Sequence, residues 1–244
     1  MTEPQPAPKA RAHIPWPPLV EGRLIRRYQR FKADVRLAGG ATVTAHCTNT
    51  GAMHTCSAPN RPVFLSTSDN PRRKLKYTWE MIDMPTSLVG VNTRIPNRLV
   101  ALGITRNHIA GLGGYREVKP EITTGAKTRL DLLLQGAHRR DCFVEVKNCT
   151  LVEDGVARFP DAATARGARH LEELTRLVAA GNRGAMVYLI QRMDARQFRP
   201  ADRIDPHYGA VLRRAVGRGV EVFAYDVVID LEKIALGSPI PICI

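Results

Sequence analysis

The sequence has no long apolar run, few cysteines and fewer acidic than basic residues. None of its 244 residues lies in a stretch that approaches the ~20 consecutive apolar residues needed to span a bilayer. Residues 1–18 are rich in proline and alanine and lack the apolar centre of a secretory signal. These absences favour a cytoplasmic protein with no membrane partner. Five cysteines at irregular spacing do not form the pattern of a disulfide framework.

Two widespread ligand-binding signatures are also missing. There is no Cys-x-x-Cys pair, which disfavours a zinc site among the histidines and cysteines of residues 46–56. No glycine-rich motif of the Walker or dinucleotide-binding type occurs, so the sequence does not indicate a nucleotide-binding fold.

Positive charge is the main compositional feature that is present. The chain has 36 Lys and Arg against 23 Asp and Glu, a formal net charge of +13. Such a balance favours a polyanionic partner, with nucleic acid first and an anionic membrane surface as the competitor. A basic surface kept for solubility is the third interpretation. A hydrophobic fraction of 44% is enough for an ordinary folded core.

The N-terminal third has the pattern of short strands separated by turn residues. About five such strands suggest a small barrel of the OB type, with an SH3-like barrel as the alternative. We expect residues 1–14 to form a flexible extension and residues 15–84 to form a DNA-binding OB-fold domain. The expected strands are residues 22–28, 31–37, 41–45, 61–66 and 75–79.

From about residue 85 the pattern changes to alternating helices and strands. The order helix, three strands, helix, strand, helix, strand predicts an α/β domain with a mixed sheet over residues 85–244. Asp161 is placed to cap or charge the start of the second helix. The expected helices are residues 97–112, 163–179 and one opening at 205–206, and the strands are 115–122, 129–134, 142–149, 185–190 and 220–225.

Two neighbouring strands of this domain bring acidic residues together. If residues 128–134 and 142–147 pair as a hairpin centred near His138, Asp131 falls opposite Glu145, and opposed residues project from the same face. Lys147 is two residues from Glu145 and shares that face. The pattern predicts two carboxylates and one ammonium on one patch of sheet, provided that the register does not slip by one residue.

Such a patch suits phosphodiester hydrolysis. Mg²⁺ or Mn²⁺ on Asp131 and Glu145 would bind a phosphate oxygen and lower the pKa of a bound water, and Lys147 would assist the attacking water. A cross-strand ion pair on a solvated face is the simpler alternative. The strongly apolar flanks of both strands favour the metal site. Glu117, on the preceding strand, is a candidate third carboxylate, and Glu121 competes for that role.

Basic residues interleaved with aromatic ones predict where DNA binds, because they combine phosphate neutralisation with base stacking. Two such clusters fall in the barrel, beside Tyr28 and Phe31 and before Tyr77 and Trp79. On the second helix, a basic pair at i, i+4 spacing shares one face and is expected to reach phosphate near the metal site. The predicted DNA-binding residues are Arg26, Arg27, Arg30, Lys32, Arg72, Arg73, Lys74, Arg166 and His170.

Several long motifs resemble those of the sugar fermentation stimulation protein A (SfsA) family of bacteria and archaea. The resemblance runs from about Leu19 to Tyr225. Its motifs are residues 27–35, 46–53, 66–74, 91–93, 97–99, 117–119, 128–131, 144–147, 159–162, 166–171 and 219–221.

The resemblance implies an N-terminal OB-fold domain followed by a nuclease domain of the PD-(D/E)xK type. By position, Asp131 would be the first acid of that motif, Glu145 and Lys147 its Glu-x-Lys, and Glu117 the upstream acid. Leu130 stands where the motif has proline. The family also implies non-specific DNA binding and a regulatory link to maltose metabolism.

Two functions follow from these observations. In one, the protein is a metal-dependent deoxyribonuclease of the PD-(D/E)xK type that acts with little sequence preference. In the other, it is a non-catalytic DNA-binding regulator linked to sugar metabolism. The acidic residues and the lysine favour the first, and the family description favours the second. The oligomeric state is left open, with a homodimer as one option.

Overall fold

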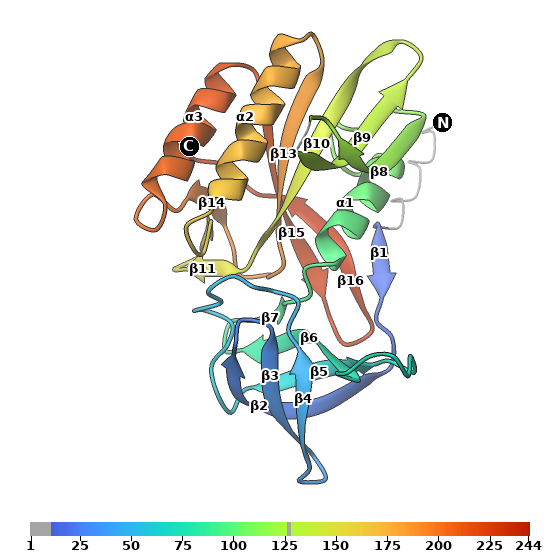
Figure 1. The fold of residues 1–244 in the computed structure, drawn as a ribbon, viewed down its shortest axis with the longest axis vertical. Coiled ribbons are helices and arrows are strands. Elements are labelled where there is room, and N and C mark those ends of the chain that lie inside the picture. Colours follow the sequence, from blue (N-terminus) through green and yellow to red (C-terminus); the bar gives the residue numbers. More distant parts are fainter. Residues whose placement is uncertain (1–10, 126–127) are drawn as a thin grey trace, which may run out of the picture.

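The computed structural model describes residues 11–125 and 128–244. In this part the chain forms two lobes, a β-barrel and a larger α/β domain, stacked one upon the other (Figure 1). No helix within the described ranges is both long and apolar enough to cross a membrane.

The barrel closes through a ring of five strands in the order β2-β3-β4-β6-β5, because β4 pairs with β6 in addition to β3. The alternating residues predicted these strands, and the expected OB-type barrel is confirmed. Gly22 is needed in β2, since a Cβ atom there would clash with Val35 on the neighbouring strand. The strands are β2 Leu19–Tyr28, β3 Lys32–Leu37, β4 Thr42–His46, β5 Pro62–Thr67, β6 Tyr77–Met84 and β7 Ser87–Gly90.

The α/β domain is built on a seven-stranded mixed sheet in the order β1-β16-β15-β13-β10-β9-β8. The three central strands β10, β13 and β15 are parallel, and the strands on both sides are antiparallel. The mixed sheet predicted from the sequence is therefore confirmed. Its strands are β1 His13–Pro15, β8 Glu117–Thr123, β9 Arg129–Gly136, β10 Arg139–Cys149, β13 Arg183–Ile190, β15 Glu221–Ile229 and β16 Lys233–Pro239.

Helices cover both faces of this sheet. Helix α1, Ile95–Thr105, packs on one face, and α2, Ala165–Ala179, and α3, Pro206–Gly217, pack on the other (Figure 1). Helix α2 begins at Thr164, whose side chain accepts a hydrogen bond from the Gly167 amide. The expected cap Asp161 instead lies outside the helix. A small sheet packs into the same core cluster as α2 and α3 and consists of β11 Leu151–Glu153, β12 Val156–Phe159 and β14 Gln197–Pro200.

Among the boundaries that differ from the expected ones, three concern the first helix and the division of the chain into domains. Helix α1 ends at Thr105 rather than near residue 112, because Asn107 adopts a positive φ of 58°. Ile109 and Leu112 continue the apolar spacing of the helix in the sequence, although both lie beyond its end. They are apolar because they are buried there. The expected domain division after residue 84 falls inside the β6–β7 hairpin, so the barrel sheet extends to Gly90. Within the expected extension, residues 1–10 lie outside the described part, and residues 13–14 belong to β1.

Partly buried hydrogen bonds join the two lobes. Arg192 follows β13 and is 4% exposed, and its guanidinium donates to both the carbonyl and the hydroxyl oxygen of Thr55 in the barrel. Thr48, after β4, accepts from the Thr93 amide and donates to Asn92. Because buried donors and acceptors are expensive to separate, these contacts hold the barrel in a fixed position on the α/β domain.

Candidate metal and nucleic-acid site

Asp131 lies where the strands β9 and β10 part. The ladder pairs Cys142 with Leu134 and Val144 with Leu132, which is the register predicted for a hairpin centred near residue 138. One residue further on, Oδ2 of Asp131 accepts the Val146 amide at 2.8 Å, in place of another backbone pair. Its Oδ1 accepts from Asn97 Nδ2 of α1 at 2.7 Å. The carboxylate is thus fixed by the opposite strand and by the helix behind it.

Glu145 projects into the same pocket as Asp131 and is 3% exposed. Its Oε1 accepts a hydrogen bond from Lys147 Nζ at 2.6 Å and another from Nδ1 of His170 on α2. Its Oε2 is buried and has no hydrogen-bond partner among the described residues. A buried carboxylate oxygen without a partner is costly, so this atom marks a place where a ligand would be stabilised.

The two carboxylates affect each other electrostatically. Burial, followed by the negative charge of Glu145, raises the pKa of Asp131 to about 6. Burial also acts to raise the pKa of Glu145, but the hydrogen bond from His170 and the charge of Lys147 outweigh it, so that pKa lies below its ordinary value. Lys147 and His170 therefore keep Glu145 ionised. Asp131 lies beside this negative charge, where a cation would be stabilised.

His170 lies behind the carboxylates and not at the surface. It is 5% exposed, and its Nε2 accepts from Arg166 Nε at 3.3 Å while its Nδ1 contacts Glu145. The i, i+4 spacing of Arg166 and His170 on one helix face is as expected. The predicted phosphate contact of His170 is corrected, because its ring nitrogens are engaged by protein groups. Arg166 does line the pocket.

The barrel supplies one wall of this pocket, which has a volume of about 390 Å³. Residues 48–51 of the barrel line it together with the acids. Asp161, on the opposite wall, accepts the Met53 amide at 3.1 Å. Gly51 comes so close to Asp161 that a Cβ atom would overlap the carboxylate. The walls of the pocket are therefore held together where the two lobes meet.

The residues present fit a hard divalent cation. Among the described residues there is no group of three or more His, Cys, Asp or Glu side chains arranged as a metal site. Mg²⁺ needs no such group, since it keeps several waters and commonly binds one or two carboxylates together with substrate phosphate. Asp131 and Glu145, with the unpartnered Oε2, provide that donor set.

Glu117 lies apart from the other acids. It is exposed, pairs with Lys119 at 3.2 Å and stands opposite Gln135, four residues along β9 from Asp131 or about 13 Å. Glu121 is better placed, because it lines an adjoining hollow together with Asp131. The structure therefore brings Glu121, and not Glu117, toward the site.

The predicted DNA-binding arginines of the first barrel cluster have different roles. Arg27 donates to the backbone carbonyls of Arg30, Asn49 and Gly51 at 2.8–2.9 Å, so it holds the loop together and is corrected as a DNA contact. Arg30 donates from Nε to the Thr50 carbonyl at 3.2 Å. Arg26 remains open to solvent with its side chain 68% exposed, although it pairs with Asp34.

A continuous basic face crosses the barrel and reaches α1. Lys32 stands opposite His46, and His46 in turn stands beside Thr78, whose hydroxyl accepts from Arg73 at 2.9 Å. Burial, followed by the charges of Arg94 and Arg73, lowers the pKa of His46. We call Lys32, His46, Arg73 and Arg94 the basic face. Arg72 and Lys74 are exposed next to it.

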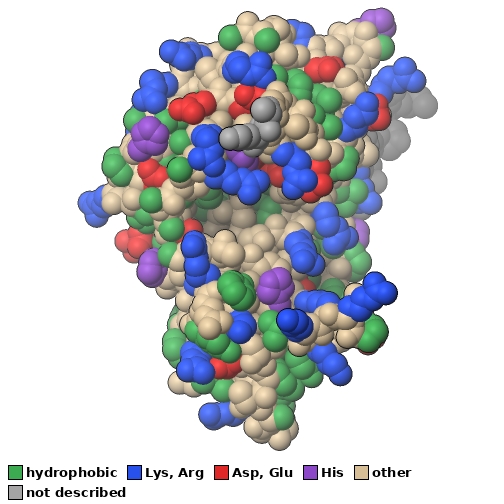
Figure 2. Space-filling model, viewed as in Figure 1, with side chains coloured by type: hydrophobic (Ala, Val, Ile, Leu, Met, Phe, Trp, Pro, Cys, Tyr) green, Lys and Arg blue, Asp and Glu red, His purple; other side chains and the backbone are tan. Residues whose placement is uncertain are grey.

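The basic face leads toward the pocket that contains Asp131 and Glu145, which we call the candidate metal pocket. Arg94 and Arg98, at the start of α1, line the hollow that also contains Asp131. Figure 2 shows Lys and Arg side chains both above and below the depression between the two lobes. Arg94 and Arg98 from the start of α1 and Arg166 from α2 therefore place positive charge next to the hollows that contain the carboxylates.

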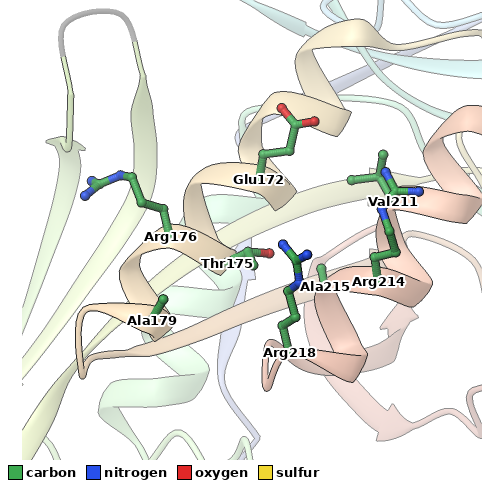
Figure 3. A pocket seen from close by; sticks show the side chains of 8 residues that line it. All are labelled: Glu172, Thr175, Arg176, Ala179, Val211, Arg214, Ala215 and Arg218. Carbon is green, nitrogen blue, oxygen red and sulfur yellow. The ribbon is translucent and has the colours of Figure 1, made fainter.

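A second basic groove lies between α2 and α3 and has a volume of about 590 Å³. Figure 3 shows Arg218 of α3 extending toward Thr175 of α2, whereas Arg176 points away from the groove. Glu172 is the one acid among the residues that line it. The groove has no paired carboxylates and shares no lining residue with the candidate metal pocket.

Several residues of the site were not predicted from the sequence to belong to it. Asn97 binds Asp131, Asp161 joins the lobes, and Phe159 lines the pocket. All three lie in motifs that carry the family resemblance. Arg94 lies in none of these motifs, and only its positive charge could have indicated that it belongs to the site.

The fold and the site together define a class of protein. It consists of an OB-fold barrel followed by an α/β domain with a mixed sheet. The model of the SfsA N-terminal OB domain matches residues 25–91, and that of the sugar fermentation stimulation protein RE domain matches residues 94–233. The chain belongs to the sugar fermentation stimulation protein (SfsA) family.

Relatives support this assignment over nearly the whole chain. The sugar fermentation stimulation protein homolog of Geobacter sulfurreducens is 52% identical over 225 residues, covering 92% of this chain and 96% of that protein. The homolog of Geotalea daltonii is 48% identical over 226 residues, with 93% and 97% coverage. The solved structure of Pyrococcus furiosus SfsA in complex with Ca²⁺ is 26% identical, has a TM-score of 0.88 and covers 96% of this chain and 100% of that one.

Proposed function

We propose that the protein is a metal-dependent deoxyribonuclease with little sequence preference. The observation that carries the proposal is the buried, unpartnered Oε2 of Glu145 in the same pocket as Asp131. The similar P. furiosus protein was solved with Ca²⁺, which supports a divalent cation at a site of this family. We assign Mg²⁺ or Mn²⁺ to Asp131 and Glu145.

When bound, the ion would lower the pKa of a bound water and polarise a phosphate oxygen. The chain's own groups orient the reactants. Lys147 is fixed by its 2.6 Å contact with Glu145 and offers its remaining N–H groups to a phosphate oxygen, where charge develops during hydrolysis. Arg166 donates through Nε to His170. The two terminal nitrogens of Arg166 would then donate hydrogen bonds to the same phosphate.

The basic face would bind the DNA backbone. Its four members come from β3, β4, the segment before β6 and the start of α1, and none belongs to a helix that could enter a major groove. Backbone contacts fix the position of DNA without reading its sequence. We therefore expect binding that depends strongly on salt and weakly on sequence.

The test compares wild type with Asp131→Asn on supercoiled plasmid and linear duplex or single-stranded DNA, each with Mg²⁺, Mn²⁺ or EDTA. We expect cleavage that needs the metal and disappears in the variant. Cleavage that persists in EDTA or in the variant would contradict the metal-site mechanism. A shift in melting temperature on adding Mn²⁺, present in wild type and absent in Asp131→Asn, checks the metal site without relying on activity.

One observation favours a second candidate, a non-catalytic DNA-binding regulator of sugar metabolism. Lys147 and His170 already engage Oε1 of Glu145, so that carboxylate is compensated without a metal. In this case DNA binding would be unaffected by Mn²⁺, and the melting temperature would not respond to the metal.

A further inference from the structure

Phe31 is an exposed aromatic side chain in the turn between β2 and β3. It is 47% exposed, whereas most large apolar side chains of the barrel are buried in its core. The two residues before it, Gln29 and Arg30, have φ values of 48° and 64°, a conformation that is uncommon for residues other than glycine. The chain thus adopts a strained turn that leaves a phenyl ring in water.

This turn is fastened to the wall of the candidate metal pocket. The Phe31 carbonyl accepts the Cys47 amide at 2.8 Å, and Arg30 donates to the carbonyl of Thr50, which lines the pocket. Arg27 ties the Arg30 carbonyl to those of Asn49 and Gly51. The backbone of the turn that carries Phe31 is therefore joined by several hydrogen bonds to the residues of the pocket wall.

The neighbouring aromatic residue is not available in the same way. The Tyr28 ring lies under the Arg26 guanidinium, 4.8 Å from its centroid, and near Lys32 at 5.9 Å. No such cation–π partner is found for Phe31 in the described residues. Phe31 directly precedes Lys32 of the basic face in the chain, so an exposed aromatic residue and the surface assigned to the phosphates share one turn.

A second aromatic residue lies on the opposite wall. Phe159 lines the pocket together with Arg166 and packs against Tyr188 and Tyr208, with ring centroids 5.5 Å and 5.2 Å away. The acids lie between this wall and the barrel loop, in a pocket of about 390 Å³ whose walls are joined through Asp161. That volume is at the small end of the range for ligand pockets of roughly 300–1,000 Å³.

An aromatic ring beside a basic surface recognises unpaired bases. The faces of bases in a duplex are stacked on one another, whereas a single strand offers them to aromatic side chains. We propose that the substrate is single-stranded DNA and that Phe31 stacks on one of its bases at the entrance to the candidate metal pocket. This inference rests on the proposed function for the role of the pocket, but it concerns binding and not cleavage.

The test measures fluorescence anisotropy of a labelled single-stranded oligonucleotide and of its blunt duplex with the full-length protein in EDTA, so that no DNA is cut. We expect tighter binding of the single strand. Phe31→Ala should weaken single-strand binding about tenfold, since stacking on an aromatic side chain contributes roughly 1–3 kcal/mol per base, and should change duplex binding little. Phe31→Tyr should retain the affinity, and Phe31→Leu should not.

The matched control is Leu231→Ala, which removes a 52% exposed apolar side chain from the turn between β15 and β16. It should leave binding of both DNAs unchanged. Phe31→Trp adds a direct readout, because the native Trp16 and Trp79 are buried and the introduced indole should be quenched by single-stranded DNA. Melting temperatures of the variants verify that each remains folded.

Equal losses for single strand and duplex, no loss in Phe31→Ala, or tighter binding of the duplex would overturn the inference. Its failure is distinct from that of the nuclease. A protein that binds single strands through Phe31 but never cuts them contradicts the proposed function and supports the inference. A metal-dependent nuclease whose single-strand affinity is the same in Phe31→Ala contradicts the inference alone.

Discussion

Charged side chains of the site are buried in the α/β domain, whereas those of the barrel are exposed to solvent. Glu145 and His170 are 3% and 5% exposed and are hydrogen-bonded to each other. In the barrel, by contrast, the Arg26 side chain is 68% exposed and its contact with Asp34 is open to water. Buried charges interact strongly with their neighbours, whereas exposed charges are screened by solvent and salt. Single substitutions should therefore have large effects in the first region and small, cumulative effects in the second.

The largest effect is expected from Glu145→Gln. The variant keeps the size of the side chain but loses the negative charge and the anionic Oε2 that would bind the metal. Cleavage should fall to the level seen with EDTA, and Mn²⁺ should no longer raise the melting temperature. DNA affinity in EDTA should persist, because the basic face is intact. Wild-type cleavage by this variant would show that buried charge does not control the site.

His170 should show a smaller effect of the same kind. It positions Glu145 through Nδ1 and Arg166 through Nε2, and loss of such an outer partner typically reduces metal affinity or activity about 10–100-fold. His170→Asn places an amide nitrogen near the position of Nδ1, where it can donate to Glu145. His170→Gln can place its amide oxygen near the position of Nε2, where it accepts from Arg166.

We expect His170→Asn to preserve more Mn²⁺ affinity, measured by calorimetry, and His170→Gln to preserve a lower KM for DNA. His170→Ala should lose both. If all three variants lose metal affinity equally, His170 supports the fold in general and does not position the two groups separately.

The basic face should respond cumulatively. Replacing Lys32, Arg73 and Arg94 together by alanine should reduce the salt dependence of single-strand binding by about 2 log units per log unit of salt, at about 0.7 per phosphate contact. Each single replacement should have about a third of this effect. The control is the double variant Arg214→Ala, Arg218→Ala in the α2–α3 groove. An equal change of slope in that control would mean that total charge, and not its place, determines binding.

The smallest effect is expected on stability. Asp131→Asn should raise the melting temperature in EDTA by ~2–4 °C. Removing the charge buried beside Glu145 stabilises by about 3 kcal/mol, and losing one of the two hydrogen bonds that the carboxylate accepts offsets about 2 kcal/mol of this. The pKa of Asp131 is raised to about 6 in the folded protein, so its ionisation destabilises the fold. The advantage of the variant should be absent below the unfolded pKa of about 3.9, grow with pH and be complete above about pH 6. Thermal melts across this range check the sign.

The central acids could be predicted because they follow local rules. Alternation within β9 and β10 and the length of their connection fix the register, and so the position of Asp131 and Glu145. His170 and Arg27 could not be placed in the same way. Their partners lie 25 and 22–24 residues away on other elements, and helix spacing or positive charge says nothing about such distant contacts. The same reason explains why Asp161 was expected at a helix end and not between the lobes.

The strand β1 has a consequence for how the protein is made. It precedes the barrel in the chain, yet it pairs with β16, so that His13 lies opposite Ala235. During synthesis from the N-terminus the barrel has all its strands long before this partner exists. The edge of the large sheet can close only when nearly the whole chain has left the ribosome. Until β16 has been translated, β1 has no partner strand, although the barrel that follows β1 in the chain already has all its strands.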